Sequence, residues 1–474
     1  MSTPYQCGCA RAKSKLDYDG DLQVMVKLRF YGGVNEIGGN KILVEDGETR
    51  VFFDFGQSFS MGCDFFTGWL HPRSINGLGD YFKFGLLPKL KGLYARDQLE
   101  FTDVPYCEPR FDAIFLSHAH FDHTNHIEFL DPKIPVYLGV GTKIFAEAME
   151  KTGSFCRYGK HDYHTFRTGD KIEVGQLVVE PIHVDHSIPA AYGFLIHTSE
   201  GSIVYSGDLR CHGPRKDMTE EFADKGQGCE PLAMICEGTR MVEVERRKNY
   251  SEEQVEKLSN LIVSSTDKLV LITHYSRDMD RLRSFYKVAK KNERKLVVSP
   301  KTAYLLGRLM EDKRLDLPDP LVDDNVVVYY KRKKSGRFDE KDYFTWERQF
   351  MNRMVTYEFV HKNQRTLVMD LDFNQFTELV DINPHPNSHF IHSMSEPHSE
   401  EDFEDQVMHN WLNHFKAEFH QLHASGHMDK MQILNLVDYI KPKKIFPVHT
   451  ENPHLFRNSS SKLESTKYAK EYSL

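Results

Sequence analysis

The feature of this 474-residue sequence that most limits its fold is a cluster of histidines directly behind a short apolar stretch. Residues 113–116, "AIFL", have the composition of a buried strand, and the next seven residues, "SHAHFDH", contain His118, His120, Asp122 and His123. Side chains that follow a buried strand lie at the edge of the sheet, where α/β proteins place their ligand sites. The pattern therefore predicts an α/β protein whose functional site includes this loop.

The spacing His-x-His-x-Asp-His is typical of a loop that binds metal ions. Two imidazoles in one tight turn can approach the same ion, and Asp122 with His123 can bind a second ion nearby. Surface histidines are common in a chain that has 24 of them, yet four fixed positions behind a strand favour a metal site. His126 falls outside the pattern, and we expect it to be an ordinary loop or helix residue.

Two metal ions require more ligands than this loop contains, so further histidines and carboxylates should follow other strands. Four candidates stand in that setting: Asp54, His186, Asp208 and His449. Each is weak evidence alone, but their shared position behind an apolar stretch strengthens the prediction of one site. His183 lies three residues before His186, and we expect it to support the structure instead of binding metal.

The motifs resemble those of the metallo-β-lactamase fold, in the chain order Asp54, His118 to His123, His186 and Asp208. Three later motifs resemble the additional motifs of the β-CASP nucleases, a group that includes ribonuclease J and the cleavage nuclease of mRNA 3′-end processing. They are centred on Glu237 in "ICEGT", His427 in "HASGHMD" and His449 in "PVHTE". The resemblance extends from about residue 32 to residue 453, which is most of the chain.

The resemblance implies an α/β fold, an αββα metallo-β-lactamase sandwich with an inserted α/β β-CASP domain that has a parallel sheet. Residues 1–240 would form the first part of the sandwich, 241–420 the β-CASP domain, and 421–474 the C-terminal completion of the sandwich. The sequence agrees, because many short strands give way from about residue 251 to strands that alternate with helices. Between residues 316 and 420 the pattern is irregular.

The resemblance also implies a ligand set for two zinc ions (Zn²⁺). His118, His120 and His186 would hold one ion, Asp122, His123 and His449 the other, and Asp208 would bridge both. Asp54 would bond to a ligand histidine and fix its orientation. In this arrangement an activated water attacks the phosphorus atom of a phosphodiester in line.

The remaining motif residues resemble groups that handle the leaving group and the substrate end. His427 would act as general acid toward the leaving 3′-oxygen, positioned by Glu237. The sequence reads "EGT" where relatives often read "EST", which leaves the carboxylate in place. His423, Ser425, Gly426 and His427 resemble the turn with which ribonuclease J binds a terminal 5′-phosphate, helped by the amides of the helix that follows.

The expected function is therefore that of a zinc-dependent ribonuclease acting on single-stranded RNA in RNA processing or decay. A 5′→3′ exonuclease that prefers 5′-monophosphate ends is the main expectation, and internal cutting, with the turn only positioning His427, is the alternative. A small-molecule hydrolase would have no need of Glu237 and His427. A DNA nuclease of the Artemis type typically has valine in place of His449. A non-catalytic RNA-binding homologue would lack metal ligands, and none is missing.

Composition and charge limit the partners and the cellular location that we expect for this chain. The net charge of −8 argues against a uniformly basic nucleic-acid binder, and a local basic groove stays open. No apolar run approaches the roughly 18 residues of a membrane helix, and residues 1–23 lack the apolar core of a signal peptide. We therefore expect a cytoplasmic protein without a membrane partner. A homodimer is one option for its oligomeric state.

Two further features have ordinary interpretations. The eight cysteines are scattered as reduced thiols would be, and Cys7 with Cys9 lacks the second pair of a zinc site, so a flexible leader is expected there. The basic run from Lys331 to Arg337 is either a solvated loop or a contact to the phosphate backbone. Aromatic residues near it could stack on bases or belong to the core.

Overall fold

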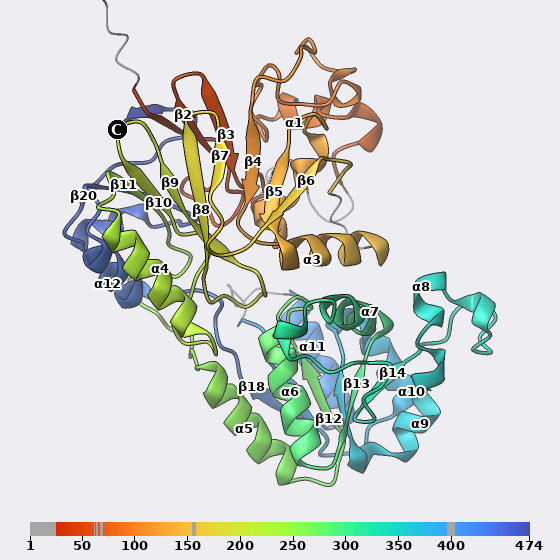
Figure 1. The fold of residues 1–474 in the computed structure, drawn as a ribbon. Coiled ribbons are helices and arrows are strands. Elements are labelled where there is room, and N and C mark those ends of the chain that lie inside the picture. Colours follow the sequence, from red (N-terminus) through yellow and green to blue (C-terminus); the bar gives the residue numbers. More distant parts are fainter. Residues whose placement is uncertain (1–24, 61, 63–64, 67–69, 154–157, 396–402) are drawn as a thin grey trace, which may run out of the picture.

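The structure is a computed structural model that describes residues 25–474 apart from 61, 63–64, 67–69, 154–157 and 396–402. Cys7 and Cys9 lie outside the described residues. Three seven-stranded sheets form two bodies, drawn above and below one another in Figure 1. No helix of the described residues is long and apolar enough to cross a membrane.

The first sheet has the strand order β21-β1-β2-β3-β4-β5-β6. Its strands are β1 (Lys27–Phe30), β2 (Ile42–Asp46), β3 (Thr49–Phe53), β4 (Ala113–Leu116), β5 (Val136–Gly139), β6 (Tyr163–Phe166) and β21 (Glu471–Ser473). Strands β3 to β6 are parallel, so their carboxyl ends meet at one edge of the sheet. Helices α1 (Gly79–Lys83) and α3 (Val140–Lys151) pack on its outer face.

The second sheet has the strand order β20-β19-β11-β10-β9-β8-β7. Its strands are β7 (Ile172–Val174), β8 (Leu177–His183), β9 (Tyr192–His197), β10 (Ser202–Tyr205), β11 (Ala233–Glu237), β19 (Lys444–Val448) and β20 (Lys462–Leu463). Helices α4 (Lys216–Gly228) and α12 (Lys430–Ile440) cover its outer face.

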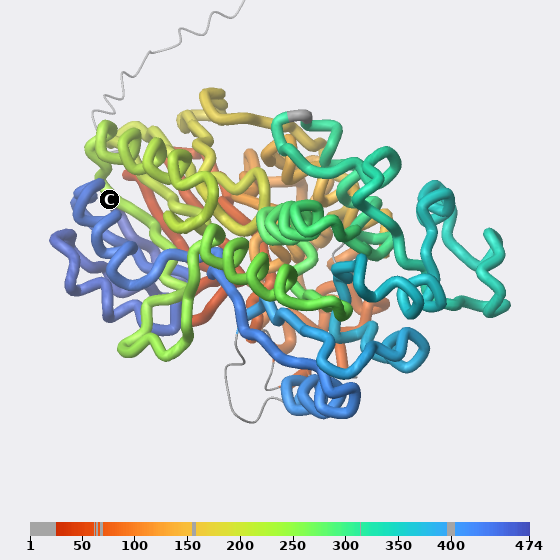
Figure 2. The backbone as a smooth tube through the Cα atoms, turned by 90° about the horizontal axis from the view of Figure 1, so that it is seen from below, coloured from red at the N-terminus to blue at the C-terminus, as the bar shows by residue number. Residues whose placement is uncertain are grey.

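The inner faces of these two sheets share one aromatic core. Phe115 of the first sheet and Phe194 of the second have ring centroids 5.9 Å apart, and Phe53 lies 5.4 Å from Phe194. Helix, sheet, sheet and helix therefore stack in the αββα order that the resemblance implied. Because β21 pairs with β1 and β19 pairs with β11, the end of the chain returns to this sandwich. In Figure 2 the blue C-terminal segment lies beside the yellow-green helix α4.

The third sheet is entirely parallel, with the strand order β15-β14-β13-β16-β12-β17-β18. Its strands are β12 (Val270–Thr273), β13 (Lys295–Val298), β14 (Val326–Tyr329), β15 (Met354–Val355), β16 (Leu367–Asp370), β17 (His389–His392) and β18 (Glu418–Gln421). Helices α5 (Glu252–Ser264), α6 (Met279–Lys291) and α7 (Pro300–Leu309) pack on one face, and α9 (Tyr357–Lys362), α10 (Leu379–Ile382) and α11 (Phe403–Phe415) lie on the other side. This parallel sheet was expected, whereas the domain limits at 240 and 420 stay a proposal.

The sequence pattern was least informative between residues 316 and 420, where it showed no regular period. The structure places four strands of the third sheet wholly within this segment, and β18 begins there too. Each of these strands has four residues or fewer; β16, for example, reads "LVMD". Such runs are too short for a periodicity to distinguish strand from loop.

A buried ionic network joins the third sheet to the sandwich. The Arg210 guanidinium, which follows β10, donates to Glu252 Oε1 at 2.9 Å and to Asp280 Oδ2 at 2.6 Å. Arg281 donates to the same Glu252 carboxylate at 2.9 Å. Burial raises and the two guanidinium groups lower the pKa of Glu252, which settles at about 2. Loss of one partner would leave the other as a buried, unpaired charge, which is costly. The network therefore fixes α5 and α6 against the sandwich.

Candidate metal centre

The loop of His118 to His123 is held in place by Asp54, the residue that follows β3. Its carboxylate accepts hydrogen bonds from Ser117 N at 2.7 Å, Ser117 Oγ at 2.8 Å and the Tyr205 hydroxyl at 2.6 Å. Asp54 Oδ2 also lies 2.7 Å from His123 Nδ1. This bond turns His123 Nε2 away from Asp54 and toward Asp208 and Asp122.

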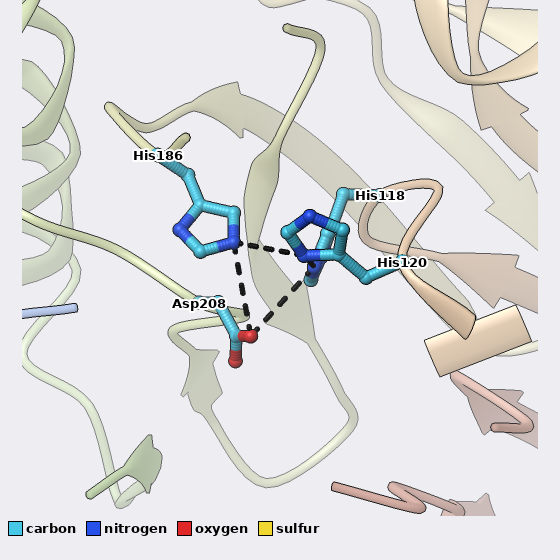
Figure 3. Close-up of side chains that lie close together, drawn as sticks. All are labelled: His118, His120, His186 and Asp208. Carbon is cyan, nitrogen blue, oxygen red and sulfur yellow. Dashed lines mark hydrogen bonds and ion pairs between the residues drawn. The ribbon is translucent and has the colours of Figure 1, made fainter. Parts of the chain in front are cut away.

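The first of two clusters consists of His118, His120, His186 and Asp208, shown in Figure 3. His118 Nε2 and His186 Nε2 lie 2.9 Å and 3.1 Å from His120 Nδ1. The same two nitrogens lie 3.6 Å and 3.9 Å from Asp208 Oδ2. Four potential ligand atoms therefore point at one small volume.

The second cluster consists of Asp122, His123, Asp208 and His449. His449 Nε2 lies 2.8 Å from Asp122 Oδ2, and His123 Nε2 lies 3.1 Å from Asp208 Oδ2. Because Asp208 Oδ2 belongs to both clusters, this one carboxylate links them. All four side chains are at most 4% exposed.

The outer ring nitrogens of the histidines are held by other groups. His186 Nδ1 donates to Gly426 O at 2.6 Å, and His449 Nδ1 lies 2.8 Å from Thr239 Oγ1. Together with the bond between Asp54 and His123, these contacts leave the inner nitrogens free to act as ligands. His186 and His449 reach the cluster because β8 and β19 end at the same edge as β4.

The charges in the clusters fit a bound cation. Burial lowers the pKa of His118 and His120 well below the usual value and that of His186 to about 3, so these imidazoles are neutral and can donate lone pairs. Burial alone would also lower the pKa of His449, but Asp208 and Asp122 raise it to about 9. The buried carboxylates of Asp208 and Asp122 thus favour a positive charge in the second cluster.

Asp208 Oδ1 supports the same conclusion. It is buried and has no hydrogen-bond partner among the described residues. A buried carboxylate oxygen without a donor is costly, and a metal ion would satisfy it. The donor set of imidazoles and carboxylates is one that Zn²⁺ accepts.

Glu237 and His427 form a separate pair beside the clusters. His427 Nδ1 lies 3.0 Å from Glu237 Oε1 and 4.0 Å from Asp208 Oδ2. Glu237 is fully buried, whereas the His427 side chain is 19% exposed and open to a substrate. Burial raises and His427 lowers the pKa of Glu237, which is lowered overall, so the carboxylate is ionised. An ionised carboxylate at Nδ1 accepts a hydrogen bond from the Nδ1 proton and fixes the orientation of the His427 ring.

The turn from His423 to His427 only partly matches the phosphate-binding expectation. Ser425 Oγ accepts from His427 N at 3.1 Å, and a Cβ on Gly426 would lie 2.8 Å from His186 Cε1. Gly426 is thus required by the packing of a candidate ligand. Half-buried His423 donates to Ser393 O through Nδ1, and desolvation lowers its pKa to about 3, so it carries no charge.

Two amides after His427 are engaged within the protein, so binding of a 5′-phosphate by this turn stays a proposal. Met428 N donates to Leu209 O, and Asp429 N donates to Gln432 Oε1. The Asp429 carboxylate caps α12 by accepting from Gln432 N at 2.9 Å. A capped helix start that carries a carboxylate repels a phosphate instead of attracting it.

Other residues from the sequence lie away from the clusters. His183 stacks on Tyr192 with ring centroids 4.1 Å apart, and His126 packs edge-on against Tyr81. In the basic run, Arg332 pairs with Asp381 and Lys333 pairs with Glu347. The neighbouring aromatic residues Tyr329, Tyr330 and Tyr343 are buried in the core, so they are not free to stack on bases.

Sequence reasoning missed two residues that support the site. Thr239 Oγ1 donates to Glu237 Oε2 at 2.7 Å and contacts His449, so it connects the two motifs. Its place beside Glu237 in "EGT" was the available signal. Lys41 Nζ is fully buried and bonds to Gly39 O and Gly56 O. A lysine directly before the apolar residues that begin β2 was the signal for it.

Comparison with known proteins agrees with this geometry. Residues 95–225 match the family model "Beta-lactamase superfamily domain", and residues 414–460 match "Zn-dependent metallo-hydrolase RNA specificity domain". Similar curated proteins include ribonuclease J of Helicobacter pylori J99, 23% identical over 92% of this chain and 57% of its own length. Ribonuclease J of Sinorhizobium meliloti is 24% identical over 74% of this chain and 60% of its own length.

A third curated relative, ribonuclease J of Pyrococcus abyssi, is 26% identical over 58% of this chain and 58% of its own length. The chain thus spans less than two thirds of the length of these relatives. A crystal structure of a protein of unknown function from Enterococcus faecalis V583 superposes with a TM-score of 0.76 at 24% identity, covering 95% of this chain and all of that one. It shows the fold alone. The family models and the two clusters indicate a metal cofactor. The chain is thus similar to ribonuclease J proteins over most of its length, and two of its segments match a β-lactamase superfamily domain and an RNA specificity domain of Zn-dependent metallo-hydrolases.

Proposed function

We propose that this protein is a zinc-dependent ribonuclease that hydrolyses phosphodiester bonds in single-stranded RNA. The observation that carries the proposal is the pair of buried ligand clusters that share Asp208, next to the Glu237–His427 pair. The match to an RNA specificity domain and the ribonuclease J relatives support RNA as the substrate. The proposal includes a role in cytoplasmic RNA processing or decay.

The chain offers ligands for two zinc ions. His118, His120 and His186 would hold one, Asp122, His123 and His449 the other, with Asp208 between them. Zinc bound there would act as a Lewis acid that lowers the pKa of water and stabilises negative charge on phosphate oxygens. The bonds from Asp54, Gly426 O and Thr239 to the outer ring nitrogens keep the ligand atoms in place before any ion binds.

His427 would supply the proton for the leaving group. Glu237 holds Nδ1, so Nε2 is the atom from which a proton can pass to the leaving 3′-oxygen. The partial exposure of His427 allows contact with substrate. Because Glu237 is buried, water does not compete with His427 for its carboxylate. The products would carry a 5′-phosphate and a 3′-hydroxyl.

A finer proposal concerns direction: cleavage from the 5′ end with a preference for a monophosphate. Support comes from the Ser425 hydroxyl and from the resemblance of its turn to that of ribonuclease J. The occupied amides of Met428 and Asp429 remove one source of binding energy, so the hydroxyl and the metal centre would have to carry the preference. Internal cutting is the competing mode.

The test of the general proposal uses purified protein with zinc and two single-stranded oligonucleotides of one sequence, one RNA and one DNA, each labelled at either end. We expect the RNA to be cleaved to products with 5′-phosphates and the DNA to be cleaved far more slowly. Faster cleavage of DNA would support the DNA nuclease alternative, and no cleavage of either with zinc bound would support a binding protein. Sedimentation of the same sample tests the homodimer.

A further inference from the structure

A second group of metal-ligand side chains lies in the third sheet, apart from the clusters already described. His389 on β17 and Glu418 on β18 are opposite each other in the parallel pairing, and His420 is two residues further along β18. Side chains two residues apart on a strand lie on the same face, so all three project together. One potential ligand atom from each of His389, Glu418 and His420 lies within 4.8 Å of the other two.

The distances fit a single small cation. His389 Nδ1 lies 2.9 Å from His420 Nε2 and 3.6 Å from Glu418 Oε2. Two ligands bound tetrahedrally at about 2.1 Å from zinc lie about 3.4 Å apart, which is between these two values. Two histidines and one carboxylate are also the protein ligands of known zinc sites that keep a fourth position open.

The surroundings leave both imidazoles able to bind a cation. Burial lowers the pKa of His389 and that of His420, and each neutral ring has one nitrogen that carries no proton. The charges that act on His389 are Glu418 and Arg294, and the Arg294 guanidinium is already bonded to four backbone carbonyls of Val263, Thr266, Lys268 and Leu367. The Glu418 side chain is 55% exposed, so an ion can enter from solvent.

We propose that His389, Glu418 and His420 form a divalent-cation site, with zinc as the fitting ion, that is separate from the metal centre of the sandwich. The ion would take the place of the hydrogen bond between the two imidazoles and join β17 to β18 through their side chains.

The position of the site gives it a structural consequence. Strand β18 is the edge of the third sheet and pairs only with β17 among the described strands. It runs directly into the turn that contains His427, through Leu422, whose carbonyl accepts from Ser393 Oγ after β17. An ion between β17 and β18 would stiffen the strand from which the catalytic turn extends.

The test counts zinc ions on the full chain after removal of all metal and titration with zinc against a competing chelator. The variants are His389→Ala, His420→Ala and Glu418→Gln, and His392→Ala is the matched control. His392 belongs to the same strand but points to the opposite face, where it bonds to Gln421. We expect the wild type and His392→Ala to bind one zinc equivalent more than His389→Ala or His420→Ala.

Glu418→Gln keeps the proposal falsifiable if a histidine variant fails to fold, because Glu418 is exposed. We expect its extra zinc equivalent to bind at least about tenfold more weakly, since even groups that only orient a ligand change affinity by that much. Equal zinc counts in all folded variants, or unchanged affinity in Glu418→Gln, would overturn the site. The zinc count does not depend on RNA cleavage, so it tests this site even if the protein proves not to be a ribonuclease.

Discussion

One carboxylate oxygen of Asp208 lies 3.1 Å from His123 Nε2, while its other oxygen is buried without a hydrogen-bond partner among the described residues. The first oxygen also belongs to the cluster of His118, His120 and His186. A single side chain therefore sets the separation of the two ligand groups. Removal of it should affect both groups at once.

We expect Asp208→Ala, and equally His120→Ala, to lower the zinc content and to abolish RNA cleavage, because each removes a ligand of the proposed centre. The measurement is zinc per chain by mass spectrometry together with cleavage of end-labelled RNA. Asp224→Ala, at an exposed aspartate of α4, is the control and should behave as wild type. Cleavage at the wild-type rate in a folded Asp208→Ala protein would rule out the metal mechanism.

The Glu237–His427 pair leads to a different expectation. His427→Ala should keep its zinc but slow cleavage by about 10²- to 10⁴-fold, the usual effect of losing general acid catalysis. His454→Ala removes an imidazole that is 46% exposed and serves as control. A loss of zinc in His427→Ala would instead identify His427 as a ligand, a role that its position 4.0 Å from Asp208 makes worth testing.

Thr239 offers a test of how the ligands are oriented. Thr239→Val keeps the shape of the side chain but removes the hydroxyl that bonds Glu237 and His449, so we expect zinc affinity to fall about 10- to 100-fold. Thr239→Ser should restore most of it. Thr142→Val, which removes a comparable buried hydroxyl bonded to Ala190 O, should leave zinc affinity unchanged. If both valine variants bind zinc alike, Thr239 has no orienting role.

The sequence alone was sufficient for the parts of this protein whose signal is local. The loop of His118 to His123 follows a four-residue apolar strand, and both the strand and the position of the loop at its carboxyl end were predictable. The αββα layers and the parallel third sheet followed from the family resemblance and from alternating patterns. Helices α5 and α6 lie where the sequence pattern alternates strands with helices, and their starts carry the capping residues Ser251 and Asp278.

The parts that could not be predicted depend on contacts between distant residues. Arg210, Glu252 and Arg281 are ordinary charged residues in the sequence, and only the fold buries them together. The strands between residues 316 and 420 are too short to show a period. Asp429 resembles any helix cap, and its effect on the turn at His427 follows from its three-dimensional position.

Lys41 allows a prediction about pH. Burial lowers its pKa from 10.5 to about 8, so between these values the unfolded chain binds more protons than the folded chain and stability rises with pH. Lys41→Met lacks this gain. The thermal midpoint of the variant should therefore fall further behind that of wild type as the pH rises from 8 to 10, by a few degrees. Exposed Lys91→Met is the control. A constant difference across this range would show that the pKa of Lys41 is not lowered in the folded protein.

The last prediction concerns the substrate end. RNAs that differ only in a 5′-monophosphate, triphosphate or hydroxyl should be degraded at different rates, with the monophosphate fastest and mononucleotides as products, if Ser425 contacts the terminal phosphate. Ser425→Ala should then reduce the preference by raising KM for the monophosphate RNA. Because Ser425 Oγ also accepts from His427 N, a lower kcat on all three RNAs is expected as well, so the ratio between ends is the decisive quantity. Ser459→Ala, which removes a hydroxyl bonded to Phe456 O, is the control. Equal rates on all three ends, with internal fragments and no mononucleotides, would leave an endonuclease whose turn at Ser425 serves only to position His427.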